Sequence, residues 1–101
     1  MKGTPSTFAI RLKAARIAKG LTQEQLGIMA GIDEFSASAR MNRYEKGIHE
    51  PHFATVEKIA EVMGLPTAYF YCQEDDAAEL LSLFHHMSAE AKTQLLIMAK
   101  R

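Results

Sequence analysis

Two helical segments that follow one another almost without a linker restrict the folds open to this chain. The first covers residues 8–19, and Gly20 is well placed to end it in a left-handed conformation. Thr22 has the character of an N-cap, and Gln25 completes a capping-box pattern three residues later, so that a short second helix ends near Gly31. No convincing alternating strand with a tight hairpin turn accompanies them. The predicted fold class is therefore all-α.

The segment IDEFSASARMNRYEKG, residues 32–47, predicts a third helix with two different faces. Ala37, Met41 and Tyr44 lie at positions i, i+4 and i+7 and are expected to face the core. The opposite face carries a small residue, an amide and two cations: Ala39, Asn42, Arg43 and Lys46. A slender helix end followed by such side chains suits the major groove of DNA, where Arg recognises guanine and Asn recognises adenine.

Two further helices complete a predicted five-helix domain over residues 1–71. A fourth helix extends roughly over residues 52–63 and stops at Gly64, and Pro66 suits the first position of a short fifth helix. The residues expected inside the domain are Phe8, Leu12 and Ala15 with Ile10 and Ile17 as further candidates, then Leu26, Met29, Ala30, Phe53, Val56, Ile59, Ala60, Met63, Tyr69, Phe70 and Tyr71.

The remaining residues, 72–101, predict a helical hairpin. Its first helix has an acidic start, and Ser88 is the expected cap of the second helix. The apolar residues expected on the two helices are Leu80, Leu81, Phe84 and Met87, followed by Ala91, Leu95, Ile97 and Met98. Because so small a pair cannot bury both its faces, it must pack on the domain or on a second copy, which makes it the candidate dimer surface.

The formal charge of the chain is zero, but it is unevenly distributed. Residues 1–47 hold eight Lys and Arg and four acidic residues, a net charge of +4, and the rest of the chain carries −4. The basic residues include Lys2 and those on the polar face of the first helix, which are Arg11, Lys13, Arg16 and Lys19. Positive charge is thus concentrated where phosphate contacts would be needed.

Composition limits the setting of the protein. Cys72 is the single cysteine and cannot form an internal disulfide, which favours a reducing cytosol. The amino-terminal sequence lacks the apolar core of a signal peptide, and no run approaches the roughly 20 apolar residues of a membrane helix. A soluble protein is expected, located in the cytoplasm with the nucleoid and not in a membrane.

Several motifs in their order resemble the Cro/CI (Xre-type) helix-turn-helix family of DNA-binding transcriptional regulators. They are Arg16, GLTQEQLGIMAGI at residues 20–32, RYEKG at residues 43–47, Pro51, and IAEVMGLPTAYFY at residues 59–71. The resemblance covers about residues 8–71 and implies a five-helix, lambda-repressor-like helix-turn-helix domain. It implies a sequence-specific regulator that binds double-stranded DNA, with a repressor favoured. Because a single such domain buries little DNA surface, specific affinity is expected from a homodimer on a near-palindromic operator.

The resemblance also implies roles for individual residues. Gln23 is similar to the glutamine that bonds the DNA backbone and supports the recognition helix. Arg16 and Glu45 match a structural ion pair between the first helix and the end of the recognition helix. Base-reading positions fall on Ser38, Ala39, Asn42 and Arg43, and phosphate contacts fall on Arg40 and Lys46.

The chain departs from the family in one place. Thirteen residues separate Gly31 from Glu45, about four more than the family usually has, and four residues are about one α-helical turn. The simplest interpretation adds this turn to the amino end of the recognition helix, which would also present Ser36 to the DNA with Glu34 or Phe35. The alternative is a wider turn before the helix.

Other classes of function find little support. The sequence has no G-x-S-x-G, P-loop, GxGxxG or HExxH motif, and its histidines have no acidic or Cys companions, so that no catalysis, cofactor or metal is expected. The alternative function is an antitoxin or another module that binds a protein partner, such as a toxin or an anti-repressor, through the same fold.

Overall fold

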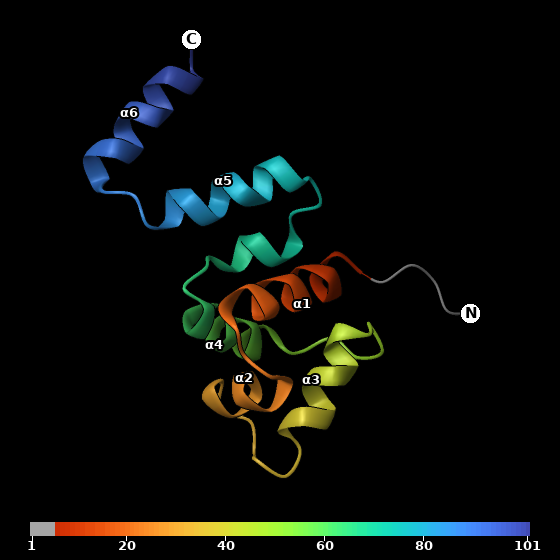
Figure 1. Ribbon diagram of the computed structural model, residues 1–101. Helices are drawn as coiled ribbons and strands as arrows, with labels where there is room; N and C mark the ends of the chain where they lie inside the picture. Colours follow the sequence, from red (N-terminus) through yellow and green to blue (C-terminus); the bar gives the residue numbers. More distant parts are fainter. Residues whose placement is uncertain (1–5) are drawn as a thin grey trace.

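The computed structural model describes residues 6–101, and this part of the chain is entirely helical (Figure 1). Its elements are α1 (Thr7–Lys19), α2 (Gln23–Met29), α3 (Ala37–Glu45), α4 (Phe53–Met63), the 3₁₀-helix η1 (Thr67–Tyr71), α5 (Asp75–His85) and α6 (Ala89–Ala99). The predicted all-α class is confirmed, and the predicted fifth helix is η1. The first residues of the predicted 1–71 domain, Lys2 among them, lie outside the described residues.

Local signals set most helix ends, as the sequence predicts. The Thr22 side chain accepts a hydrogen bond from the Gln25 amide, and the Gln25 side chain accepts one from the Thr22 amide, which completes the capping box at the start of α2. Gly20 ends α1 in the left-handed conformation with φ 74°. Ser88 caps α6 through the Ala91 amide. Pro66 lies one position before η1 rather than inside it.

The core lies among α1, α2, α3, α4 and η1. Its fully buried large side chains are Leu12, Leu26, Met41, Val56, Ile59 and Phe70. Ala37 and Tyr44 are buried as predicted, and Ile32 joins the core from the chain after α2. This core fixes α3 by one face and leaves its other face to solvent.

Five predicted core residues are exposed instead: Ile10, Ile17, Met29, Phe53 and Tyr71. Ile10 and Ile17 each lie two positions from a buried residue of α1, and two positions on a helix correspond to nearly opposite faces. Met29 and Phe53 occupy the last and first positions of their helices, where the core no longer reaches them. Tyr71 keeps contact with the Phe8 ring at 5.7 Å between centroids. Partial burial and the Glu50 carboxylate raise the pKa of Tyr71.

Helices α2 and α3 approach each other closely at Gly27. A Cβ placed there would lie 2.8 Å from the Cβ of Ala37 and 3.1 Å from its carbonyl oxygen. Neither atom can move without moving α3. The absence of a side chain at Gly27 therefore sets the distance between the two helices.

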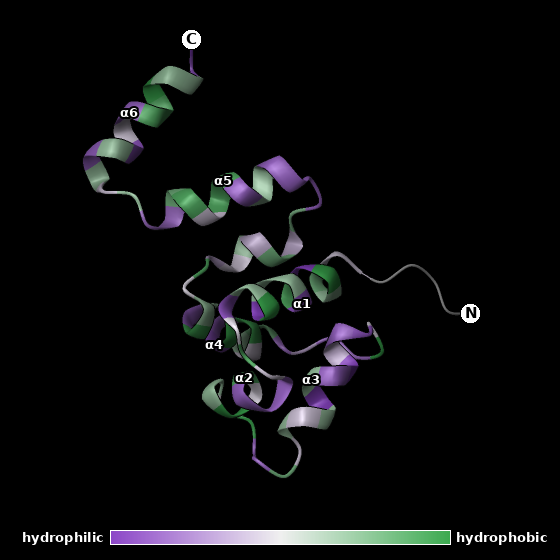
Figure 2. Cartoon of the chain, viewed as in Figure 1, coloured by the Kyte–Doolittle hydropathy of each residue, from purple (hydrophilic) through white to green (hydrophobic). Residues whose placement is uncertain are grey.

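The carboxyl-terminal helices are attached to this domain at only a few points. Helix α5 packs on η1 and buries Ala78, whereas α6 has no buried residue. The Arg11 guanidinium donates to the carbonyl oxygens of Cys72 and Gln73 at 2.8 and 2.9 Å, and the His86 Nε2 lies 2.7 Å from the Gly64 carbonyl oxygen. Helix α6 projects away from the domain with hydrophobic residues along it, as Figures 1 and 2 show.

Candidate nucleic-acid interface

The face of α3 turned away from the core carries most of the predicted site. Ser38, Ala39, Arg43 and Lys46 are exposed, and Asn42 is partly buried. Arg40 is also exposed, and its guanidinium donates to the Tyr44 hydroxyl at 2.9 Å, which holds the cation beside the helix. The structure thus places small, amide and cationic side chains along one side of a helix that is fixed by its other side.

A buried ion pair fixes the end of α3. Arg16 Nε donates to Glu45 Oε2 at 2.5 Å, and Arg16 Nη2 donates to Oε1 at 3.1 Å. The third guanidinium nitrogen donates to the Leu21 carbonyl oxygen at 2.8 Å. The side chains are 13% and 3% exposed, so that both charges are largely removed from water and compensated by one another. One guanidinium therefore ties α1, the chain before α2 and α3 together.

Gln23 connects this ion pair to the exposed face. Its amide nitrogen donates to Glu45 Oε1 at 3.0 Å and lies 3.3 Å from Asn42 Oδ1. A carbonyl oxygen has two lone pairs, so Asn42 Oδ1 can accept this bond and still accept one from a base. The resemblance implied that Gln23 supports the recognition helix, but nothing in the spacing of residues 23 and 42 indicates that their amides meet.

The extra residues before Glu45 lengthen the turn and not the helix. Helix α2 ends at Met29 and α3 begins at Ala37, so the interpretation that the recognition helix gains a turn at its amino end is wrong. Gly31 starts the wider turn with φ 90°, a conformation that favours glycine, and Ile32 anchors it in the core. Ser36 occupies the N-cap position but makes no capping bond through its side chain, and its hydroxyl lies 3.4 Å from the Asp33 carbonyl oxygen.

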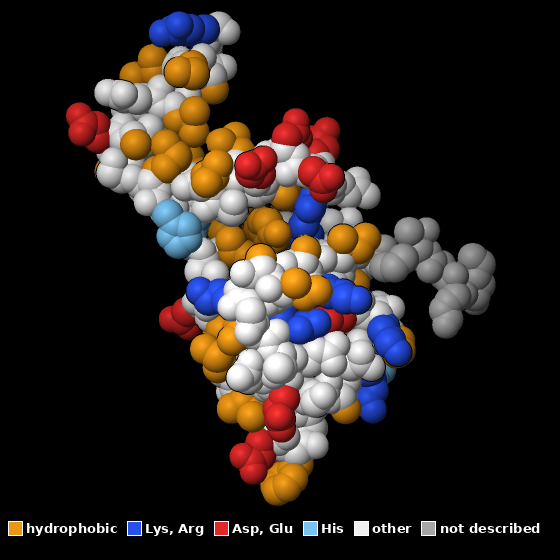
Figure 3. All heavy atoms as spheres, in the orientation of Figure 1, with side chains coloured by type: hydrophobic (Ala, Val, Ile, Leu, Met, Phe, Trp, Pro, Cys, Tyr) orange, Lys and Arg blue, Asp and Glu red, His pale blue; other side chains and the backbone are white. Residues whose placement is uncertain are grey.

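Basic and acidic side chains are separated only in part, because Asp33 and Glu34 are exposed in the turn before α3, and Lys100 and Arg101 are exposed at the end of the acidic half. Figure 3 shows Lys and Arg side chains over α1 and towards α3, and acidic side chains over the start of α5. Of the basic residues predicted on the polar face of α1, Arg11 and Arg16 are held by internal hydrogen bonds, while Lys13 and Lys19 are exposed. The cations of α1 available to an outside anion are therefore its lysines.

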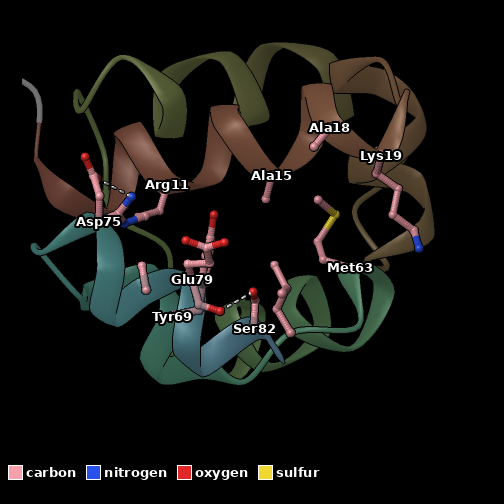
Figure 4. Close-up of a pocket in the computed structure, with 11 residues that line it drawn as sticks. Arg11, Ala15, Ala18, Lys19, Met63, Tyr69, Asp75, Glu79 and Ser82 are labelled. Carbon is pink, nitrogen blue, oxygen red and sulfur yellow. Dashed lines mark hydrogen bonds and ion pairs between the residues drawn. The ribbon is translucent and has the colours of Figure 1, made fainter. Parts of the chain in front are cut away.

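A pocket of about 420 Å³ lies where α5 meets the domain. Figure 4 shows Arg11 reaching Asp75 at one end of it and Lys19 with Met63 at the other.

Among residues 6–101, no group of three His, Cys, Asp or Glu side chains is arranged to hold a metal ion. No helix in the same range is both long enough and apolar enough to cross a membrane.

Known proteins support a regulatory function for this arrangement. Residues 7–69 match the model of a helix-turn-helix domain family. The chain is similar to a solved structure titled the crystal structure of transcriptional regulator BswR, with 48% identity, 91% of each chain covered and a TM-score of 0.84. Among curated proteins, none matches the chain significantly. The chain therefore belongs to the helix-turn-helix domain family, as a DNA-binding regulator and not an enzyme.

Proposed function

We propose that the protein is a repressor of the Cro/CI type that binds a near-palindromic operator as a homodimer. The observation that carries the proposal is the exposed face of α3, which presents Asn42 and Arg43 from a helix whose buried face and end are both fixed. Rigid presentation matters because base recognition depends on hydrogen-bond geometry. A repressor needs only to occupy an operator, which one DNA-binding surface can do.

The residues divide by the part of DNA that each would contact. Ser38, Ala39, Asn42 and Arg43 are the proposed base-reading set, and Arg40 and Lys46 are proposed phosphate contacts. Gln23 is also a proposed phosphate contact, through its main-chain amide at the start of α2, because its side-chain amide already donates to Glu45 and Asn42. Arg43 would read guanine through two hydrogen bonds, and Asn42 would read adenine. Ser36, at the start of α3, remains a proposed contact. The Arg16 and Glu45 pair takes no part in contact and holds the set in position.

The boundary between the DNA-binding part and the dimerising part is proposed at residues 71 and 72. Helices α5 and α6 carry exposed Leu80, Leu83, Leu96, Ile97 and Met98, and Figure 3 shows hydrophobic side chains along these helices. Within the hairpin, the Lys92 ammonium lies 5.1 Å from the centre of the Phe84 ring, but α6 finds no core of its own. A second copy would cover this apolar surface and place two α3 helices about one turn of DNA apart.

The experiment that tests the proposal is selection of bound duplexes from a random DNA pool by the purified protein. Salt should be near physiological, since low salt rewards binding to any sequence. Enrichment of a two-fold symmetric motif is the expected result. Failure of a folded protein to enrich any motif would overturn the proposal and favour the antitoxin or other partner-binding function.

The dimer has its own test in the exposed apolar side chains. Ile97 is 59% exposed, so Ile97→Asp should leave the fold of one chain intact but separate the two copies. Sedimentation equilibrium should show a dimer for the unaltered protein and a monomer for the variant. Ile17→Asp is the matched control, because Ile17 is 58% exposed but lies on α1. A dimer that survives Ile97→Asp would contradict the proposed surface.

A further inference from the structure

The turn between α2 and α3 carries an aromatic side chain, Phe35, that lies outside the core. Phe35 is 90% exposed, more than any other large hydrophobic side chain described. A single exposed hydrophobic residue is ordinary on a protein surface. The position and the order of this turn are what make Phe35 informative.

The turn holds Phe35 in a defined place. The Phe35 amide donates to Asp33 Oδ2 at 3.0 Å, and the Ser36 amide donates to the Asp33 carbonyl oxygen at 3.0 Å. This is the arrangement in which an Asp side chain supports a tight turn. Ile32 on one side and Ala37 on the other are buried, so the turn is anchored at both ends. Little backbone freedom would therefore be lost if the phenyl ring met a partner.

The same turn lies at the end of α3 that would enter the DNA. Phe35 precedes the first residue of α3 by two positions and the proposed base contact Ser38 by three. In helix-turn-helix proteins the amino-terminal residues of the recognition helix reach the base edges in the major groove. The wider turn therefore extends the proposed reading surface beyond the helix itself.

The negative charge of its neighbours and the apolar character of its ring indicate which part of the DNA Phe35 would contact. Asp33 and Glu34 are its exposed neighbours, and their carboxylates would be repelled by phosphates. On the floor of the major groove the apolar feature is the 5-methyl group of thymine, which apolar side chains including Phe contact. From these observations we infer that Phe35 is a specificity-determining residue that reads a thymine methyl group in each half-site. This inference rests on the proposed function, because it needs an operator.

The test removes single methyl groups from the DNA. Each thymine of the selected operator is replaced in turn by deoxyuridine, which keeps the base pair and lacks only the methyl. The unaltered protein should lose about fourfold in affinity for each half-site at one thymine position, the effect of about one buried methyl group. Phe35→Ala should bind the original operator with the same loss and should no longer distinguish thymine from deoxyuridine there. Phe35→Leu should keep part of the discrimination.

Two controls separate the outcomes. Replacing thymines elsewhere in the operator should change the affinities of the unaltered protein and of Phe35→Ala by the same factor, and Ile17→Ala, at another exposed apolar residue, should keep full discrimination. If Phe35→Ala keeps the original affinity, or still distinguishes the two bases, the inference is overturned while operator binding by Asn42 and Arg43 stands. If the unaltered protein selects no operator, the proposed function fails and the inference fails with it.

Discussion

The helix-turn-helix domain and the carboxyl-terminal hairpin reach their stability in opposite ways. In the domain, five helical elements share one core, and a buried ion pair closes the end of α3. In the hairpin, α5 buries only Ala78 and α6 buries nothing. The domain buries its core within one chain, whereas the hairpin leaves apolar side chains exposed. The difference supports the proposal that the first region contacts DNA and the second a second copy of the chain.

The largest effect on stability is expected from removing one partner of the buried ion pair in the domain. Glu45→Ala should lower the free energy of unfolding by about 3–5 kcal/mol, because it leaves the Arg16 guanidinium buried without its counter-charge. Denaturant unfolding measures this loss. Lys46→Ala, at the exposed neighbouring position, is the control and should change stability by less than about 0.5 kcal/mol. An unchanged midpoint for Glu45→Ala would mean that the pair does not hold α3.

The next effect tests the close approach of α2 and α3. Alanine is the better helix former by about 1 kcal/mol, yet Gly27→Ala should destabilise the domain by about 1–3 kcal/mol, because the new methyl would overlap Ala37. Thermal or denaturant unfolding shows whether the substitution raises or lowers the free energy of unfolding. In Ala37→Gly protein the same substitution should cost less, since the opposing Cβ is gone. Equal costs in the two backgrounds would show that the helices separate freely.

The third prediction separates reading from anchoring on the exposed face. Arg43→Ala should weaken binding to the operator by about 1–3 kcal/mol and relax the preference at one base pair. Lys46→Ala should weaken binding to all DNA sequences alike and lower the slope of log affinity against log salt concentration by about 1. Fluorescence anisotropy with operator and random duplexes at several salt concentrations distinguishes them. An equal loss on both duplexes for Arg43→Ala would assign that residue to phosphate.

The smallest effect is expected at the attachment of the hairpin. Arg11 pairs with Asp75 at 3.1 Å, but the Asp75 side chain is 96% exposed, so the pair lies in water. Asp75→Asn should therefore cost at most about 0.2–1 kcal/mol in unfolding free energy. Arg11→Ala should cost more, because the Cys72 and Gln73 carbonyls also lose their donor. A loss for Asp75→Asn as large as that for Glu45→Ala would erase the contrast between the two regions.

Sequence alone predicted what local rules decide and erred where packing decides. The capping box at Thr22 and the left-handed Gly20 depend on neighbouring residues and were found as expected. Ile10 and Ile17 were assigned to the core by hydrophobicity, but the side of a helix that is buried depends on what packs there. The turn before α3 could not be told from an added helical turn, because either one accommodates four residues.

The proposed site shows the same division. Sequence placed Asn42 and Arg43 on the face of α3 opposite Met41 and Tyr44, since helical periodicity fixes relative positions. The hydrogen bond from Gln23 to Asn42 joins residues on two helices and follows only from their tertiary arrangement. The order of the Phe35 turn likewise comes from an Asp33 bond and from buried residues on both sides.

The proposal that the domain binds DNA and the hairpin forms the dimer is tested most directly by repeating the DNA selection with Ile97→Asp. The altered residue lies on α6, away from every proposed DNA contact. We predict that the variant enriches the same half-site sequence as the unaltered protein but loses the second, symmetry-related copy at fixed spacing. An unchanged two-fold symmetric motif, or a different half-site sequence, would contradict it.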